Sequence, residues 1–245
     1  MLPSMQDTLE ILSKGKLALK GEFLWGSNHT FLVQVEHEKG EMAAVYKPAK
    51  GERPLWDFPY ASLARREVAA FLVSEALEWH FVPPTVLRRR APFGIGSLQQ
   101  FIEYDVQHHY FNFDEAERQR LRPVVVFDLL INNADRKGSH IPIDENQKIW
   151  LIDHGVCFHV EEKLRTVIWD FVEEPVPDEI LDSIRTLIEK LKQDAKEPQS
   201  LSWQLRKYIS AGEVRALMRR AQALLENPFF PAPDPKRRPF PWPQV

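Results

Sequence analysis

The stretch FDLLINNADRKGSHIPIDENQKIWLIDHGVCF, residues 127–158, carries two acidic residues at points where a chain leaves regular structure. A helical apolar run ends in the polar segment NNADRKGSH, which cannot continue a buried face, so we expect Asp135 to lie in a loop. The strand-like run at residues 149–152 ends at Asp153, directly before a His-Gly pair whose glycine permits unusual backbone conformations. We therefore expect Asp153 at the end of a strand.

These two carboxylates lie on consecutive loops, joined by a hairpin with its turn at residues 144–147, so they can converge on one point. Phosphoryl transfer from a nucleotide uses such a pair: one carboxylate orients the attacking hydroxyl, and another holds the divalent ion that neutralises phosphate charge. Either aspartate alone is more typical of a capped turn or strand end than of a catalytic site. The two together favour the catalytic interpretation.

The motifs ADRKGSH and LIDHG resemble the catalytic loop and the metal-binding loop of the phosphatidylinositol 3-/4-kinase-like family, and more closely its small bacterial members within the protein-kinase superfamily. A more distant resemblance is to toxin kinases of the HipA type. The resemblance implies that Asp135 is the catalytic Asp, that Arg136 is its companion, and that Asp153 is the metal-binding Asp of the position usually written Asp-Phe-Gly. The family usually has Asn five residues after the catalytic Asp, where this chain has His140.

Composition indicates a folded protein with one large domain or two small lobes. The chain has 245 residues, 44% of them hydrophobic, and a net charge of −3 that does not point to nucleic acid or an anionic membrane. Its single cysteine, Cys157, excludes an intrachain disulfide and a cysteine-based metal site, which fits a reducing cytoplasm. No apolar run approaches the ~18–20 residues that span a bilayer, and no signal peptide is evident. We expect a cytoplasmic protein with no nucleic-acid partner and no stable membrane association.

The amino-terminal half predicts a helix over residues 4–14 and then three strands in an antiparallel meander, at residues 17–25, 30–36 and 42–48. Small residues between the first two strands would let backbone N–H groups approach nucleotide phosphates, which makes Ser27 and Asn28 candidates, although most such turns are only turns. The third strand ends with Lys47 between apolar residues, where its charge needs a partner. In the resembled kinases a lysine here contacts the nucleotide phosphates.

A broad apolar surface predicts a buried helix over residues 62–78, and Glu67 lies among its apolar residues. A glutamate there is costly unless paired, and Lys47 is the obvious partner, as in the kinase-like families. The alternative places Glu67 on the exposed side of the helix, beside Arg65 and Arg66. Residues 81–104 predict two further strands that complete a five-stranded sheet. In the resembled fold the last of these is the hinge that hydrogen-bonds adenine, which makes candidates of Phe101, Ile102 and Glu103.

The second half predicts helices at residues 114–121, from about Pro123 onward, and at residues 177–193 and 212–227. The irregular segment after Asp153 lies where kinases bind their acceptor or regulate access. Seven prolines in residues 228–245 predict an extended tail, which either clamps the large lobe or docks a partner domain. Clamping is favoured because the apolar side chains of this tail, Phe229, Phe230, Phe240 and Trp242, would prefer cover.

These observations predict an α+β, two-lobed protein-kinase-like fold. It has an antiparallel-sheet N-lobe at residues 1–105, a mainly helical C-lobe at residues 106–227, and the proline-rich tail at residues 228–245. We expect ATP with Mg or Mn between the lobes, and ATP-dependent phosphotransfer to a hydroxyl of an unidentified protein or small-molecule acceptor. The alternatives are a nucleotide-binding pseudokinase that acts as a scaffold, a lipid (phosphoinositide-type) kinase, and a nucleotidyl transferase on the same fold.

The pseudokinase alternative is motivated by His140, which stands where the family usually has Asn, and metal preference tests whether this histidine binds metal. A neutral imidazole is a poor ligand for Mg²⁺ but an acceptable one for Mn²⁺. If His140 coordinates metal, we expect a preference for Mn²⁺ and a loss of activity below pH ~6.5, where an imidazole becomes protonated. The alternative is that His140 hydrogen-bonds the Asp135 loop and never contacts metal.

Overall fold

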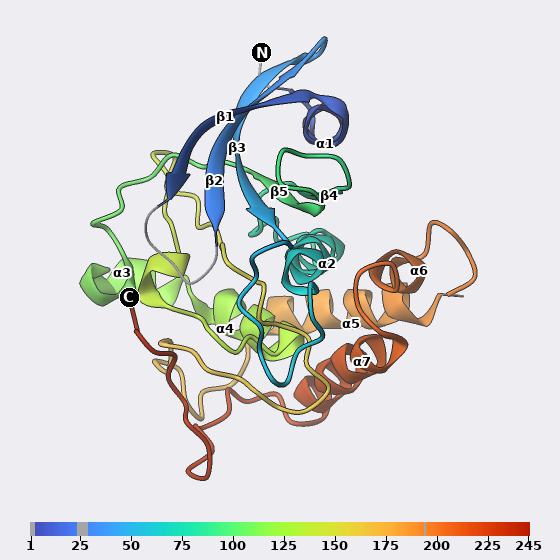
Figure 1. Cartoon of the computed structure of the whole chain (residues 1–245). Helices are drawn as coiled ribbons and strands as arrows, with labels where there is room; N and C mark the ends of the chain where they lie inside the picture. Colours follow the sequence, from blue (N-terminus) through green and yellow to red (C-terminus); the bar gives the residue numbers. More distant parts are fainter. Residues whose placement is uncertain (1–2, 24–28, 194) are drawn as a thin grey trace.

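A five-stranded antiparallel sheet forms one part of the molecule, and most of the helices form the other (Figure 1). The computed structural model describes residues 3–23, 29–193 and 195–245. The strands are β1 Lys16–Phe23, β2 Thr30–His37, β3 Gly40–Pro48, β4 Thr85–Arg88 and β5 Gly96–Gln100. Their order in the sheet is β1-β2-β3-β5-β4, with every neighbouring pair antiparallel. The predicted meander and the two further strands are thereby confirmed.

The helices follow the predicted apolar periodicity. They are α1 Met5–Lys14, α2 Leu63–Ala76, α3 Glu115–Gln119, α4 Arg122–Ile131, α5 Asp178–Lys192, α6 Leu201–Leu205 and α7 Ala211–Glu226, with 3-10 turns η1 Tyr110–Asn112 and η2 Gly138–His140. Ser4 caps α1 by accepting a hydrogen bond from the Asp7 amide, as its position in the sequence predicts. Only the short helix α6 and the two 3-10 turns were absent from the sequence-based prediction. No helix in the described ranges combines the length and apolar character that a membrane span requires.

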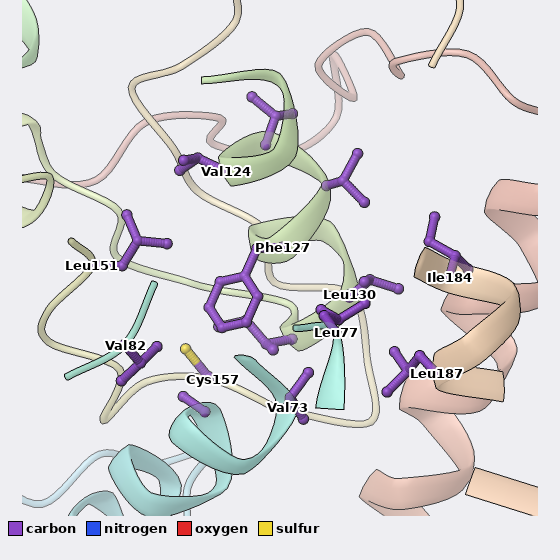
Figure 2. Packing of buried hydrophobic residues seen from close by; sticks show 14 of the residues in the cluster. Val73, Leu77, Val82, Val124, Phe127, Leu130, Leu151, Cys157, Ile184 and Leu187 are labelled. Carbon is purple, nitrogen blue, oxygen red and sulfur yellow. The ribbon is translucent and has the colours of Figure 1, made fainter. Parts of the chain in front are cut away.

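Helix α2 is packed into the same core as the helices of the C-lobe. Figure 2 shows Phe127 of α4 in the middle of this core, and the surrounding side chains come from α2, α4, α5 and the loops between them, including Val73, Leu77, Val82, Leu130, Leu151, Cys157, Ile184 and Leu187. A smaller core joins α1 to the sheet through Ile11, Leu12, Val33, Val35, Tyr46 and Leu98. Because interiors are close-packed, α2 is fixed relative to α4 and to the loops that follow it.

The predicted strand at residues 149–152 is reduced to one bridge, between Ile143 and Ile149. Asp144 explains the difference, because its carboxylate accepts hydrogen bonds from the backbone amides of Asn146 and Lys148 and from the indole of Trp150, at 2.9, 3.0 and 2.9 Å. Local side-chain bonds of this kind compete with ladder hydrogen bonds. The segment still forms the expected hairpin turn, since the Gln147 amide donates to the Asp144 carbonyl.

Residues 228–245 run along the surface of the helical part (Figure 1), but they are not extended throughout as their prolines predicted, because the Arg237 amide donates to the Asp234 carbonyl in a turn and the chain bends again at residues 240, 242 and 243. Backbone hydrogen bonds tie them down along their length, beginning with the Val176 amide to the Pro228 carbonyl. Phe230 is buried, but Phe229, Phe240 and Trp242 are 46%, 39% and 77% exposed. The expectation that all four aromatic side chains find cover is therefore wrong for three of them. Main-chain bonds hold this tail more than aromatic burial does.

Candidate active site

Lys47 on β3 and Glu67 on α2 form the predicted ion pair. The Lys47 Nζ lies 2.7 Å from the Glu67 Oε1, and the Glu67 side chain is 3% exposed. The alternative of an exposed Glu67 is wrong, and so is the exposed position it assumed for Arg66. That guanidinium is itself buried, where it donates to the Cys157 carbonyl and pairs with Glu213 of α7 at 2.6 Å. The ion pair fixes the lysine against a helix that the C-lobe core already holds in place.

Lys47 also reaches the second aspartate of the site. Its Nζ lies 3.2 Å from the Asp153 Oδ1. Burial opposes the charge on the lysine, but Asp153 and Glu67 outweigh it and hold the pKa of Lys47 above its usual value. In turn, the Lys47 charge holds the pKa of the half-exposed Asp153 below the usual value for a carboxyl, although partial desolvation acts in the opposite direction. Both groups are therefore ionised at neutral pH and face one another where β3 meets the loop after residue 150.

The backbone at Asp153 departs from the predicted arrangement. Asp153 itself adopts the left-handed conformation, with φ 62°, whereas the sequence pointed to Gly155 for the unusual geometry. The next amide, that of His154, donates to the Glu67 Oε2 at 2.9 Å and so ties this strained residue to α2. Gly155 serves close packing instead, because a Cβ there would lie 3.2 Å from the Cβ of Leu63. The strained turn aims the carboxylate toward Lys47.

Asp135 lies in a loop, as predicted, and a buried network below it holds that loop in place. The Asp135 amide donates to the Asn133 Oδ1 at 3.0 Å, and the Asn133 Nδ2 donates to the Asp128 Oδ1 at 2.9 Å. Arg136 binds the same Asp128 carboxylate, and it also donates to the carbonyls of His140 and Ile152 at 3.1 Å each. This network joins α4, the Asp135 loop and the chain segment that leads into the other aspartate.

The side chain of Arg136 is 0% exposed, so it has no surface with which to contact a substrate. Its contacts hold the Asp135 loop in place, and its role as the companion of the catalytic Asp, which the resemblance implied, stays a prediction. Asp128, Asn133 and His154 complete the network, and sequence reasoning missed all three. One signal for Asp128 was present, namely a charged residue within an otherwise apolar helix.

The Asp135 side chain is 33% exposed. Burial raises its pKa to about 6, although the positive charge of Lys137 acts in the opposite direction. The Lys137 Nζ lies 3.8 Å from the Asp135 Oδ2. A carboxylate with a pKa near neutral can accept a proton from a hydroxyl group and release it again, as general base catalysis requires.

His140 lies between the two aspartates and contacts both. Its Nδ1 is 3.1 Å from the Asp135 carbonyl oxygen, which can only accept, so Nδ1 carries the proton. Burial lowers the pKa of His140 to about 4, so the ring is neutral and its Nε2 bears a lone pair. The Nε2 atom lies 3.5 Å from the Asp153 Oδ2, which is also an acceptor. His140 thus hydrogen-bonds the Asp135 loop, as the alternative without metal contact predicted. It also lines a cavity next to Asp153, as metal coordination would require.

The His140 Nε2 and the Asp153 Oδ2 are two acceptors 3.5 Å apart, and this arrangement suits a cation bound between them. A divalent ion there would take one carboxylate oxygen and one imidazole nitrogen, a donor set better suited to Mn²⁺ than to Mg²⁺. Across the described part of the chain, no three His, Cys, Asp or Glu side chains gather in a way that could hold a metal by themselves. Further ligands would therefore have to come from phosphate oxygens and water.

A cavity of about 200 Å³ opens directly beside these groups. Its lining comes from β1, β2, β3, β5, the segment after β5 and the two loops, and consists of Phe23, Thr30, Val45, Lys47, Gln99, Gln100, Phe101, Ile102, Tyr104, His140, Ile152 and Asp153. Among the predicted hinge residues, the Phe101 amide already donates to the Ala43 carbonyl, and Glu103 lines a neighbouring groove rather than this cavity. Ser27 and Asn28, the predicted phosphate-binding residues, lie outside the described residues.

Comparison of sequences finds one close relative. Protein Rv2133c from Mycobacterium tuberculosis is 38% identical to this chain over an alignment of 272 residues, which covers 97% of this chain and 95% of that protein. No protein-family model matches the chain.

Comparison of structures finds kinases. The Golgi casein kinase with Mn/ADP bound matches with a TM-score of 0.52 and 16% identity, over 91% of this chain and 74% of that one. Hydra Fam20 with sugar matches with a TM-score of 0.54 and 15% identity, over 92% and 89% of the two chains. The Helicobacter pylori proinflammatory kinase CtkA matches with a TM-score of 0.54 and 11% identity, over 89% and 94%. At these identities the likeness concerns the fold alone, and the fold is protein-kinase-like, as predicted.

Proposed function

Because this chain belongs to the family of Protein Rv2133c from Mycobacterium tuberculosis and has a protein-kinase-like fold, we propose that it is an ATP-dependent phosphotransferase. It moves the γ-phosphoryl group of ATP to a hydroxyl group on a protein or small molecule. We further propose that its two aspartate loops work as the resemblance to the phosphatidylinositol 3-/4-kinase-like family implies.

One observation carries this proposal. Lys47 forms ion pairs with both Glu67 and Asp153, and Lys47, Asp153 and His140 line the same cavity. A cation and a carboxylate in contact at a cavity wall fit a nucleotide, because the cation pairs with phosphate oxygens and the carboxylate with the metal that accompanies them. An Mn/ADP complex of a structural neighbour supports the same ligand class.

Each group then has one role. Lys47 binds phosphate oxygens, and Glu67 holds the lysine in place. Asp135 accepts the proton of the acceptor hydroxyl as that oxygen bonds the γ-phosphorus and ADP departs. Asp153 and His140 would hold the divalent ion, whose chemistry when bound is to neutralise phosphate charge. Asp128 and Arg136 fix the relative positions of the two loops.

ATP labelled at either the α or the γ phosphate tests the proposal, with Mg²⁺ or Mn²⁺ and a cell lysate as the source of acceptors. We expect γ label on an acceptor, with Asp135→Asn inactive and the exposed control Asp182→Asn unchanged. Transfer of α label would indicate a nucleotidyl transferase, and binding without transfer would indicate a scaffold. Label on extracted lipid would indicate a lipid kinase.

Binding provides an independent measurement. A ligand that binds only the folded state stabilises it by about 2.7 kcal/mol at a hundred times its dissociation constant. ATP with a divalent ion should therefore raise the melting temperature, and Asp153→Ala should remove the metal-dependent part of the shift. The absence of any shift with any nucleotide would contradict the proposal.

A further inference from the structure

The end of the tail lies directly against the loop that carries Asp135. The Gly138 amide, three residues beyond that aspartate, donates to the Gln244 carbonyl at 2.8 Å. The Thr166 amide donates to the Pro239 carbonyl at 3.0 Å, and residue 166 is itself bridged in parallel to Arg136. The tail therefore forms an outer layer beside the Asp135 loop and the segment at residues 165–167.

Both contacts use main-chain groups of the loop and the tail. Such bonds accept the backbone of any extended polypeptide, because they do not depend on its side chains. The carbonyls of Pro239 and Gln244 are five residues apart, and the backbone between them bends at residues 240, 242 and 243. One short peptide segment thus meets both donor amides through its main chain. The contact surface therefore has the chemistry of a peptide-binding strip.

Gly138 makes room for this arrangement. A Cβ at that position would lie 2.9 Å from the ring of Phe111 and 3.6 Å from the Gln244 carbonyl oxygen. The first of these distances is too short for real atoms, so any larger residue would displace the ring that borders the strip. The tail follows the loop with bends at residues 240, 242 and 243, where prolines at positions 239, 241 and 243 restrict the backbone.

The composition of the tail is the second independent observation. Residues 228–245 contain no serine, threonine or tyrosine. A segment of this composition beside a phosphotransfer loop cannot become a product, because it has no hydroxyl side chain to accept a phosphoryl group. It offers main-chain groups to the loop, as a peptide would, and lacks the group on which the reaction depends.

We infer that the acceptor of this chain is a polypeptide segment bound through its main chain along the Asp135 loop, and that residues 239–245 stand in its place. This inference rests on the proposed phosphotransferase function and narrows its acceptor to the protein class. The tail competes with the acceptor for the Gly138 and Thr166 amides.

Placing a hydroxyl in the tail tests this inference directly. Phe240→Ser, Trp242→Ser and Gln244→Ser each create a candidate acceptor beside the loop, and two of these side chains are well exposed, so the fold tolerates the change. In the reaction the serine oxygen bonds the γ-phosphorus of ATP, the bond to the β,γ-bridging oxygen breaks, ADP departs, and the hydroxyl proton passes to Asp135. Ala232→Ser is the matched control, because residue 232 is an exposed part of the same tail that does not bond the loop.

We expect γ label on at least one of the three variants, located by mass spectrometry, and none on Ala232→Ser. The rate constant for labelling should be independent of protein concentration, as for a reaction within one molecule, and adding Asp135→Asn should abolish it. If the chain hydrolyses ATP but labels none of the three, or labels Ala232→Ser equally, the inference is overturned. If no chain binds or hydrolyses ATP, the proposed function fails first and the inference falls with it.

A binding measurement checks the strip without relying on catalysis. A chain ending at Arg238, shown by circular dichroism to be folded, should bind the synthetic peptide PFPWPQV in a calorimetric titration. The full chain should bind it at least about tenfold more weakly if its own tail covers the strip nine-tenths of the time. Equal affinity for the two chains, or no binding to the shorter one, would overturn the inference.

Discussion

Arg136 binds the Asp128 carboxylate through two of its nitrogens, with Nε 2.9 Å from Oδ2 and Nη2 2.9 Å from Oδ1. The two side chains are 0% and 1% exposed. The same guanidinium bonds the Ile152 carbonyl, directly before Asp153, so one buried pair sets the spacing of the two aspartate loops. Removal of either partner leaves a buried charge without compensation.

We expect Asp128→Asn to lower the free energy of unfolding by about 3–5 kcal/mol, the usual cost of breaking a buried pair. Urea unfolding measures this loss. The control is Asp182→Asn, which removes an exposed partner of Arg185 and should change stability by no more than about 0.5 kcal/mol. Equal effects of the two substitutions would show that the buried pair does not hold the loops.

Lys47→Met should weaken ATP binding, because it removes the only group of the proposed site that pairs with phosphate as a cation. Hydrogen bonds to charged groups contribute about 1.5–3 kcal/mol, which corresponds to roughly 10–150-fold in the dissociation constant. Glu67→Gln should weaken binding less, since Glu67 acts through the lysine. Calorimetric titration with ATP measures both, and Lys39→Met, in the turn between β2 and β3, is the control that should bind normally. Normal binding by Lys47→Met would contradict the assigned role.

The sequence predicted elements better than it predicted the partners of buried charges. Alternating strands and apolar helix faces identified the sheet and the long helices, because hydrophobic periodicity reflects burial directly. The Lys47–Glu67 pair was predictable for the same reason, since each charge interrupts an apolar run. Arg66 and Arg136 carried no such mark: one alternative placed Arg66 on the exposed side of its helix, and the resemblance made Arg136 the companion of the catalytic Asp. Their partners, Glu213 and Asp128, depend on packing between distant elements, which no local pattern encodes.

Asp135 should set the acid limb of the pH profile. A carboxyl must be unprotonated to accept the acceptor proton, and the pKa of Asp135 is raised to about 6. The kcat/KM, which reports ionisations of the free enzyme, should therefore fall as pH drops through about 6 and approach a tenfold loss per pH unit below it. Asp135→Asn should abolish transfer and leave ATP affinity nearly unchanged. Parallel loss of ATP binding and turnover in that variant would show that the residue holds phosphate instead.

The metal preference of the site should depend on His140. Its neutral Nε2 and the Asp153 carboxylate form a donor set suited to Mn²⁺, so we expect a higher kcat/KM with Mn²⁺ than with Mg²⁺. His140→Asn replaces the nitrogen with an oxygen donor and should shift the ratio toward Mg²⁺, and the metal-dependent rise in melting temperature should shift in the same direction. His80→Asn, at an exposed turn where Asn tolerates the positive φ of 51°, is the control and should leave both readouts unchanged.

The pH profile of His140→Asn then separates the two titrating groups. The sequence alone led us to expect an acid limb near pH 6.5 from this imidazole, but burial lowers its pKa to about 4. A ring with that pKa stays unprotonated, and able to bind a cation, until well below the range in which Asp135 gains its proton. His140→Asn should therefore change the metal ratio and keep the limb near pH 6. A limb that disappears with the histidine would assign it to His140, and an unchanged metal ratio would remove His140 from the metal site.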